Sequence, residues 1–425
     1  MEYRKAKRVA FVCLGCKLNF SETSTWVRTF VAHGYERVGE RKPADLYVVN
    51  SCAVTEQAEK KCRQAIRHLR KMAPDAHIVV AGCYAQLRAE ELFAIEGVDL
   101  VIGTEKKAEL FTLANALFST GKRGCYYTPV EEMTSVFPAY SSGERTRSFL
   151  KVQDGCDYHC TYCTVPLARG ASRNVPIAQL VDQAHILATS GVKEVVLTGV
   201  NTGDFGKSSG ESFLALLQAL AKIEGIPRWR ISSIEPNLLT IELLEWIART
   251  HSFLPHFHLP LQSGSDTILR QMRRRYNRGF FADRIKQIKA LMPYAFIGVD
   301  VIVGFPGERE DDFLQTYTFL EELSPSFLHV FPYSRRPNTP AAELPNQVSA
   351  AEKKERVKRL LQLSDLLSDR FYRSNIGRME EVLFEASEKG GLMSGFTRNY
   401  IKVKRPFQRE LVGEIVKMEL LQEGR

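Results

Sequence analysis

The sequence predicts an α/β protein in three parts: a parallel-sheet domain over residues 1–140, a partial TIM-like (β/α)6 barrel over residues 145–374, and a small β-barrel over residues 375–425. Short apolar segments alternate with amphipathic stretches through most of the chain, which is the pattern of βαβ units and a parallel sheet. Beyond residue 373 the pattern changes to short strands without helices between them. The 425 residues suffice for two or three domains, and a hydrophobic content of 44% can fill their cores.

In the N-terminal part, strands are expected at residues 8–14, 45–50 and 77–81. Each strand precedes an amphipathic stretch, so that helices are expected over residues 21–33, 55–72 and near 88–96. The first of these helices is expected to begin at Ser21, because serine is a favoured N-cap, and to end at Gly34.

A cysteine follows each of the three strands: Cys16, Cys52 and Cys83. Parallel strands end at the same edge of a sheet, where ligand sites form, so the three thiols are expected to meet and bind a metal cluster. The alternative is packing alone, because cysteine is a common buried residue. That alternative suits Cys13, Cys62 and Cys125. An odd total of nine cysteines, with no secretory signal, indicates reduced thiols and a cytoplasmic protein.

Three further cysteines, Cys156, Cys160 and Cys163, follow the apolar segment 149–152 with the spacing C-x3-C-x2-C. Three thiolates in one small volume suit an iron–sulfur cluster, which is normally held by four cysteines. No fourth cysteine follows nearby, so one iron would remain open to another ligand. A structural zinc site is the alternative, but zinc favours a closed set of four ligands in separated pairs.

The middle part of the chain repeats the strand–helix alternation. Strands are expected at residues 148–152, 194–198, 229–233, 255–261, 295–303 and 327–332. Helices lie between them, for instance at residues 176–190 and 211–223. Six such units predict a partial barrel with its chemistry at the carboxyl ends of the strands. A helix over residues 349–373 with an apolar stripe follows, as a core or docking element.

The C-x3-C-x2-C spacing, with Tyr162 before the last cysteine, resembles the signature of the radical S-adenosylmethionine (SAM) superfamily. The resemblance implies that Cys156, Cys160 and Cys163 are catalytic and hold a [4Fe–4S] cluster whose open iron chelates SAM. It also implies SAM-binding residues at the barrel strand ends, for each of which ordinary turn chemistry is the alternative. They are Tyr162, Thr198, Gly199, Asn201, Glu235, Gln262 and Ser263.

The segments around Cys16, Cys52 and Cys83 resemble three sequence blocks of the methylthiotransferases, which are radical SAM enzymes with a second [4Fe–4S] cluster on these cysteines. Residues 16–23 are similar to the branch that acts on N6-threonylcarbamoyladenosine beside the tRNA anticodon. The implied reaction replaces C2–H of that adenine with C2–SCH3, using one SAM as methyl donor and a second as radical source. The implied partners are a tRNA anticodon stem-loop, a sulfur source and a reductant such as flavodoxin or ferredoxin.

Strands are expected near the C-terminus at residues 380–385, 391–396, 399–403 and 411–420. Residues 395–403 resemble the TRAM domain, an RNA-binding module, which implies that Arg398, Tyr400 and Lys402 contact RNA. The basic run Arg273, Arg274, Arg275 and Tyr276 is a second candidate for RNA, and its guanidiniums are candidates for pairing with the threonylcarbamoyl carboxylate. A solvated basic loop is the alternative interpretation.

The formal charge of +9 slightly favours an anionic partner such as RNA. No uninterrupted apolar stretch has membrane-spanning length, so we expect no membrane partner. Three rival functions remain open at this point. The enzyme rivals are methylthiolation of isopentenyladenosine in tRNA or of an aspartate in a ribosomal protein. The third rival is an iron–sulfur RNA-binding protein without catalysis.

Overall fold

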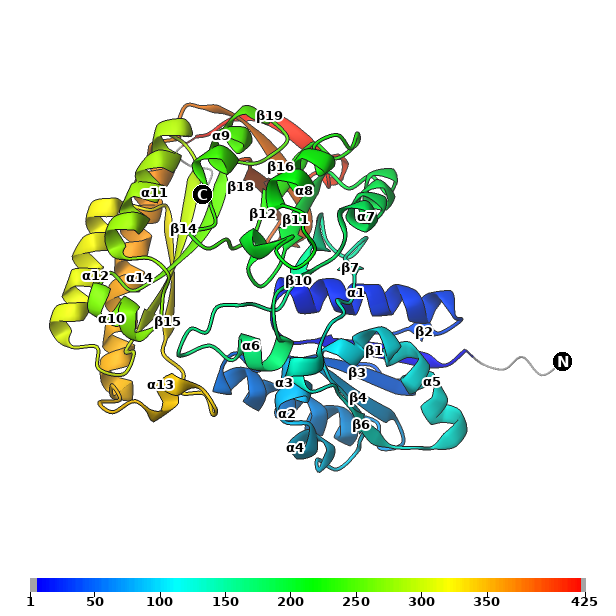
Figure 1. The fold of residues 1–425 in the computed structure, drawn as a ribbon. Coiled ribbons are helices and arrows are strands. Elements are labelled where there is room, and N and C mark those ends of the chain that lie inside the picture. Colours follow the sequence, from blue (N-terminus) through cyan, green and yellow to red (C-terminus); the bar gives the residue numbers. More distant parts are fainter. Residues whose placement is uncertain (1–5, 422–425) are drawn as a thin grey trace.

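A computed structural model describes residues 6–421 of the chain. It contains a six-stranded parallel sheet near the N-terminus, an open barrel in the middle and a curled antiparallel sheet near the C-terminus (Figure 1). The α/β fold class expected from the sequence is therefore confirmed. All nine cysteines are free thiols. In the part of the chain described here, no helix is both long and apolar enough to cross a membrane.

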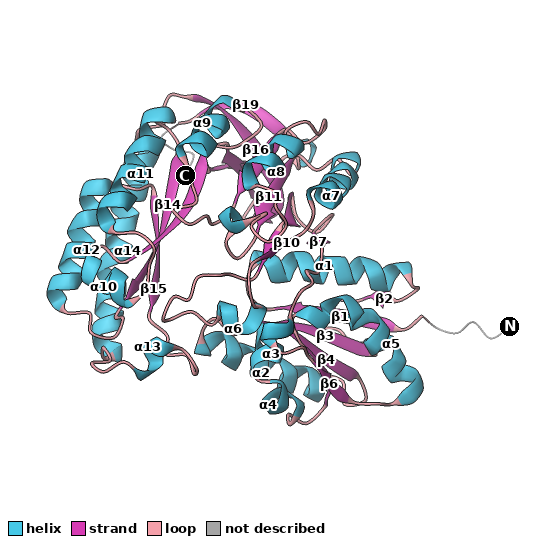
Figure 2. Cartoon of the chain, in the orientation of Figure 1, coloured by secondary structure: helices cyan, strands magenta, loops and turns pink. Residues whose placement is uncertain are grey.

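The N-terminal sheet has the strand order β2-β1-β3-β4-β5-β6 and is parallel throughout. Its strands are β1 (Arg8–Cys13), β2 (Glu36–Arg37), β3 (Leu46–Ser51), β4 (His77–Gly82), β5 (Val98–Ile102) and β6 (Gly124–Tyr126). Helices lie on both faces of the sheet (Figure 2), namely α1 (Lys17–Ala32), α2 (Glu56–Met72), α3 (Cys83–Leu87), α4 (Ala89–Phe93) and α5 (Leu110–Thr120). Alternate residues of the strands point to opposite faces of the sheet. On each face they pack with the covering helices into a separate hydrophobic core.

Sequence reasoning located β1, β3, β4 and α2 to within about a residue but misplaced the start of α1. This helix begins at Lys17 with Cys16 as its N-cap, not at Ser21. Ser21 is buried one turn inside the helix, and its hydroxyl donates to the Leu18 carbonyl. The correction matters because it places a cysteine and a lysine, instead of a serine, at the amino end of the helix.

The barrel has six parallel strands in chain order: β8 (Arg147–Lys151), β11 (Glu194–Thr198), β12 (Arg228–Ile231), β13 (His256–Gln262), β14 (Phe296–Val303) and β15 (Phe327–Pro332). These overlap the predicted segments. In the described chain, the pairing between β12 and β13 is limited to two isolated bridges, Trp229 with Phe253 and Ser233 with His258. Among residues 6–421 no ladder joins β15 to β8, so the barrel stays open on that side.

Helix α1 of the N-terminal region packs beside the open side, against β8 and the short antiparallel strand β7 (Ala139–Tyr140). The Thr25 hydroxyl and the Arg28 guanidinium both donate to the Tyr140 carbonyl. The outer helices are α6 (Val165–Arg169), α7 (Ile177–Thr189), α8 (Phe213–Leu220), α9 (Ile241–Arg249), α10 (Asp266–Gln271), α11 (Arg278–Leu291), α12 (Glu310–Leu323) and α13 (Pro340–Glu343). A two-stranded pair, β9 (Gln153–Asp154) and β10 (Arg173–Asn174), flanks the cysteine-rich loop.

Helix α14 (Ala350–Arg373) follows the barrel, with Ser349 and Glu352 forming a capping box at its start. The C-terminal sheet has the order β18-β17-β16-β19 and is antiparallel. Its strands are β16 (Met379–Lys389), β17 (Leu392–Thr397), β18 (Lys402–Pro406) and β19 (Ile415–Glu419). The sheet covers the amino ends of the barrel strands, where Arg228 of β12 donates to the carbonyls of Phe396 and Glu381.

Candidate functional site

The loop cysteine set, Cys156, Cys160 and Cys163, lies between β9 and α6 at the carboxyl end of β8. The Cys156 and Cys163 sulfurs each accept the backbone N–H two residues further on, at 3.4 and 3.5 Å. Burial and the neighbouring Cys160 thiol raise the pKa of Cys163 to about 12, and burial together with the Cys163 and Cys160 thiols raises the pKa of Cys156 to about 12. Such thiols ionise only when a metal replaces the proton, so the donor set fits a metal cluster.

The loop can turn this tightly because position 155 is glycine. Gly155 has φ of +73°, and a Cβ on it would lie 2.0 Å from the Ala171 carbonyl oxygen. No other residue fits there without moving the backbone.

The N-terminal cysteine set, Cys16, Cys52 and Cys83, comes from three different turns. Cys16 follows β1, Cys52 follows β3, and Cys83 is the first residue of α3 after β4. The three thiols lie together at the carboxyl edge of the sheet, where burial, Cys83 and Cys16 all raise the pKa of Cys52. The sheet order reverses between β1 and β3, so this edge is also the topological switch point where α/β sheets form ligand sites.

One buried arginine lies between the N-terminal cysteine set and the segment that leads into the loop set. Arg169, at the end of α6, donates from Nε to Cys83 Sγ at 3.2 Å and from Nη2 to Asn19 Oδ1 at 2.9 Å. Its Nη1 donates at 2.8 Å to Asp154, two residues before Cys156. Sequence reasoning missed Arg169, although an arginine among the apolar residues of a short helix just after Cys163 was a signal.

Arg169 belongs to a buried ionic network of five side chains, each at most 3% exposed. Lys107 and Lys151 contact Glu22 at 2.6 and 2.8 Å, and Lys151 also contacts Asp154 at 2.6 Å. Burial opposes ionisation of Glu22, but Lys107, Lys151 and Arg169 lower its pKa to about 2. Three cations against two carboxylates leave one positive charge between the cysteine sets, which suits neighbouring thiolates.

The predicted cofactor-binding residues lie at the carboxyl ends of the barrel strands, on the same side as the loop cysteine set. Thr198 is buried and donates to the Leu150 carbonyl, whereas the backbone N–H of Asn201 donates to Gln153. Gly199 lies between them, where a Cβ would be 2.8 Å from the Gln153 amide oxygen. At the end of β13, Gln262 has φ of +71°. Ser263 next to it is buried beside Thr316.

The basic run after α10 requires a correction. Arg274 is buried, and it donates to Cys160 Sγ at 3.1 Å, to the Tyr162 hydroxyl at 3.3 Å and to Glu235. Tyr276 is also buried, and its hydroxyl donates to the Pro260 carbonyl. Neither side chain is therefore accessible to RNA or to a carboxylate at the surface.

The other two arginines of the run lie at the surface. Arg273 is exposed, whereas Arg275 stacks on the Tyr158 ring and donates to the Asp157 carbonyl at 2.9 Å. Arg275 therefore lies beside the loop that carries Cys156 and Cys160. Within the basic run, these two side chains are the ones that a large substrate can reach.

Two of the three C-terminal RNA candidates point into the protein. Arg398 donates to the His251 carbonyl and pairs with Glu381, so it fastens the C-terminal sheet to the barrel. Tyr400 has φ of +65°, and its hydroxyl accepts a hydrogen bond from Arg147 at 3.3 Å. Lys402 remains exposed. Arg398 and Tyr400 thus also hold the C-terminal sheet against the barrel, and their contact with RNA stays a prediction.

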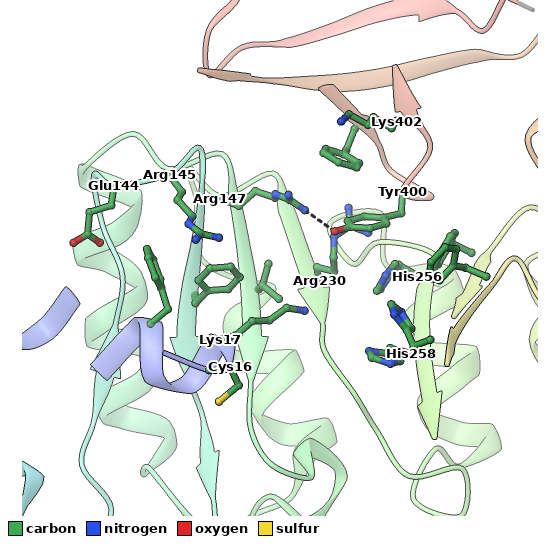
Figure 3. A pocket seen from close by; sticks show the side chains of 18 of the residues that line it. Cys16, Lys17, Glu144, Arg145, Arg147, Arg230, His256, His258, Tyr400 and Lys402 are labelled. Atoms are coloured by element: carbon green, nitrogen blue, oxygen red, sulfur yellow. Dashed lines mark hydrogen bonds between the residues drawn. The ribbon is translucent and has the colours of Figure 1, made fainter. Parts of the chain in front are cut away.

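A cavity of about 920 Å³ lies where the three regions meet (Figure 3). The start of α1 contributes Cys16 and Lys17 to its wall, the barrel contributes Arg230 and His256, and the C-terminal sheet contributes Tyr400. Burial and the Arg147 and Arg230 guanidiniums lower the pKa of Lys17 to about 8. The cavity therefore combines a cationic interior with one member of the N-terminal cysteine set.

Comparison with known proteins agrees with this division of the chain. Residues 8–103 match the model described as "Uncharacterized protein family UPF0004", and residues 150–320 match the radical SAM superfamily. The chain is 41% identical to "Threonylcarbamoyladenosine tRNA methylthiotransferase MtaB" of Bacillus subtilis (strain 168). That match covers 98% of this chain and 94% of the relative. The chain belongs to the radical SAM methylthiotransferase family.

Other relatives in this family carry a different name. "tRNA-2-methylthio-N(6)-dimethylallyladenosine synthase" of Natranaerobius thermophilus is 31% identical, over 97% of this chain and 94% of the relative. Among solved structures, the radical SAM methyltransferase TsrM from Kitasatospora setae shares the fold, with a TM-score of 0.61 at 14% identity. That match covers 79% of this chain and 75% of TsrM.

Membership of the family makes the protein a radical SAM methylthiotransferase that uses SAM and iron–sulfur chemistry. The expectation of an enzyme with these cofactors is therefore confirmed. A non-catalytic iron–sulfur protein is no longer a competing interpretation.

Proposed function

We propose that this enzyme methylthiolates C2 of N6-threonylcarbamoyladenosine 37 in tRNA, giving 2-methylthio-N6-threonylcarbamoyladenosine. The observation that carries the proposal is the position of Arg169, which donates to Cys83 of the N-terminal set and to Asp154, two residues before the loop set. The reaction needs a SAM-cleaving centre and a sulfur-bearing centre within reach of one carbon atom. The substrate follows the name of the Bacillus subtilis relative, which is 41% identical over nearly the whole chain.

We assign the SAM-cleaving [4Fe–4S] cluster to Cys156, Cys160 and Cys163, which are the catalytic residues of this proposal. A second [4Fe–4S] cluster belongs to Cys16, Cys52 and Cys83. Each set offers three thiolates and leaves one iron without a cysteine ligand. When bound, the first cluster supplies the electron that cleaves SAM to methionine and a 5′-deoxyadenosyl radical.

The chain's own residues prepare the SAM site. Arg274 donates to Cys160 and Glu235 together, which fixes the loop relative to the end of β12. Burial raises the pKa of Glu235 although Arg274 opposes the shift, so this carboxylate depends on its arginine partner. In the proposal, Tyr162, Thr198, Gly199, Asn201, Gln262 and Ser263 surround SAM at the same end of the barrel.

The proposed domains are residues 1–140 for the second cluster, 145–374 for SAM and 375–425 for a TRAM-type RNA module. The tRNA anticodon stem-loop is the proposed partner, with Arg273, Arg275 and Lys402 as candidate phosphate contacts because they are exposed. A cytoplasmic reductant such as flavodoxin or ferredoxin and a separate sulfur source complete the reaction.

The test is nucleoside mass spectrometry after incubating the anaerobically reconstituted enzyme with SAM, sulfide and dithionite. Two anticodon stem-loops of identical sequence are offered, one bearing N6-threonylcarbamoyladenosine and one bearing N6-isopentenyladenosine. We expect a mass gain for SCH3 only on the first. A product on the isopentenyl substrate alone would assign the protein to the branch of the Natranaerobius thermophilus relative.

A further inference from the structure

Helix α2 presents a positively charged face to solvent. The helix covers one face of the N-terminal sheet (Figure 1), and its apolar side packs against that sheet. On the side opposite the core, exposed residues recur at spacings of three and four, which is the helical repeat, and so form one stripe. The residues of this α2 stripe are Lys60, Gln64, Arg67 and Lys71. From its first to its last residue the stripe is about 16 Å long.

No carboxylate neutralises the α2 stripe. From Gln57 to the end of α2, the exposed residues are lysine, arginine, histidine and glutamine only. The single carboxylate of this span, Glu59, is turned inward and pairs with Arg336 of the barrel region. Within residues 6–421, no side chain forms an ion pair or hydrogen bond with the charged groups of the stripe. These cations are therefore free to bind an anion.

Other long helices of the chain do not share this charge distribution. Helix α14 also carries exposed lysines, but exposed Glu355 and Asp365 lie among them. In α11, Lys286 pairs with Asp283 at 3.6 Å. Mixed charges of this kind are typical of a solvated helix face. A face of one sign instead attracts a partner of the opposite sign, which here is a polyanion.

The α2 stripe begins close to the N-terminal cysteine set. Cys52 of that set is three residues before Thr55, the N-cap of α2. The start of α2 also contacts the barrel region, because the Glu56 backbone N–H donates to the Ser334 hydroxyl at 3.4 Å. The neighbouring Arg335 is exposed and adds a cation beside this contact. The stripe therefore starts where the N-terminal region meets the barrel and runs away from that junction.

We propose, resting on the proposed function, that the α2 stripe binds the phosphate backbone of the tRNA anticodon stem. In the proposed reaction the substrate adenine receives its sulfur at the N-terminal cysteine set. The stem is the duplex that continues from the loop carrying this adenine, so it is the part of the RNA that can lie along α2. Lysine, arginine and glutamine side chains all donate to phosphate oxygens.

Backbone contacts of this kind carry no sequence information, because duplex RNA is recognised mainly by its shape, its phosphates and its 2′-hydroxyls. The α2 stripe should therefore bind tRNAs with different stem sequences equally well. The choice of substrate is left to the loop and to the modified adenine. An acidic reductant protein is the other partner that a cationic face could bind. Its electron is needed at the loop cysteine set, whereas the stripe begins at the N-terminal set, which favours RNA.

The inference is tested with the full-length reconstituted enzyme by fluorescence anisotropy. Two RNAs carry the same threonylcarbamoyladenosine: the anticodon stem-loop and the single-stranded loop without its stem. For Lys60→Gln/Arg67→Gln/Lys71→Gln, the slope of log affinity against log salt on the stem-loop should fall by about two to three. Affinity for the stem-loop at about 0.1 M salt should fall roughly ten- to a hundredfold. Affinity for the loop alone should match that of wild type.

The matched control is Lys222→Gln/Lys354→Gln/Lys358→Gln, which removes an equal charge from exposed positions outside α2. It should keep the wild-type slope on both RNAs. Iron per chain and urea unfolding show whether the variants are folded. Lys71→Gln alone, at the end of α2 most distant from Cys52, should lower the slope by about one.

Several outcomes would overturn the inference. A folded triple variant of α2 with the wild-type slope would show that the stripe does not contact RNA. Equal losses on the stem-loop and on the loop alone would place the contact outside the stem. An equal loss in the control variant would show that only net charge matters. Unchanged RNA binding with weaker SAM cleavage by a protein reductant would assign the stripe to the reductant.

The outcome is separable from that of the proposed function. If wild type forms no methylthiolated product but its affinity for the stem-loop depends on the α2 stripe, the proposed function is wrong and the binding surface stands. If wild type forms the product and the α2 variant keeps the wild-type slope, the function stands and the binding surface is wrong.

Discussion

The two cysteine sets are built in opposite ways. The loop cysteine set lies within eight consecutive residues, 156–163, on a single turn. The N-terminal set is spread over residues 16–83 and exists only because β1, β3 and β4 are parallel neighbours. The first set needs a short loop with a glycine at position 155, whereas the second needs a folded sheet. In the proposed assignment, a local motif and a topological one therefore serve the same ligand chemistry in one chain.

This difference predicts how substitutions should affect iron binding by each set. Changing the loop set removes its thiolates without disturbing a hydrophobic core, because the loop lies between elements. The N-terminal set lies at a sheet edge that also packs against the barrel through Arg169. Substitutions that destabilise the sheet or remove Arg169 should therefore weaken iron binding by this set, even when its three cysteines are unchanged.

The largest effect is expected for Cys156→Ala/Cys160→Ala/Cys163→Ala. SAM cleavage should be abolished, because this is the set assigned to SAM, and the iron bound by the N-terminal set should remain. Reductive formation of 5′-deoxyadenosine, measured by chromatography with iron per chain, checks both statements. Wild-type amounts of 5′-deoxyadenosine would show that the assignment of the two sets is wrong.

The reciprocal change, Cys16→Ala/Cys52→Ala/Cys83→Ala, should separate the two activities. Methylthiolated product should disappear because its sulfur site is gone. 5′-Deoxyadenosine formation should continue, because the loop set lies in another part of the chain. The same chromatography with a threonylcarbamoyl stem-loop measures both products. Unchanged iron content would contradict the convergence of the three strand ends.

Arg169→Met should have an intermediate effect through the buried network. Glu22 and Asp154 would keep two lysines but lose their guanidinium, at a cost of roughly 3–5 kcal/mol in the free energy of unfolding. On the background that lacks the loop set, where remaining iron reports the N-terminal set alone, iron per chain should fall. Arg169→Lys should recover less than half of it, because an ammonium cannot make three directed contacts.

Arg173→Met is the matched control for Arg169→Met. Arg173 is buried nearby, but it donates to the backbone carbonyls of Ser135, Ala171 and Arg169, and none of its described hydrogen bonds reaches a cysteine or the Arg169 side chain. This variant should lose stability in urea unfolding and keep its N-terminal iron. An equal loss of iron in both variants would show that Arg169 acts through general stability only.

The loop cysteine set could be recognised in the sequence from its spacing alone. The N-terminal cysteine set could be recognised only after the strands had been located. Alternating apolar and amphipathic segments identified β1, β3 and β4, and the rule for parallel sheets then placed Cys16, Cys52 and Cys83 together. The start of α1 was misplaced because Ser21 is a good N-cap residue, whereas Cys16 caps the helix without a side-chain hydrogen bond. Tertiary packing outweighed the local capping preference.

Side-chain direction was the part that the sequence could not supply. Arg274 and Tyr276 stand in a run of arginines that suggests a basic surface, yet they point inward to Cys160 and Pro260. Arg398 and Tyr400 lie in a TRAM-like segment but face the barrel. Lys17 was visible only as part of a family motif. Its orientation into a cavity depends on three regions that are far apart in sequence.

The smallest effect is expected at the C-terminal sheet, which carries neither cysteine set. Lys402 and Lys404 are alternate exposed residues of β18, so both project from the same face of the strand. If this face contacts tRNA phosphates, Lys404→Gln should reduce the slope of log affinity against log salt by about one and weaken binding evenly across sequences. Titrations of stem-loop binding at several salt concentrations measure it, and an unchanged slope would place the RNA on the arginine side, at Arg273 and Arg275.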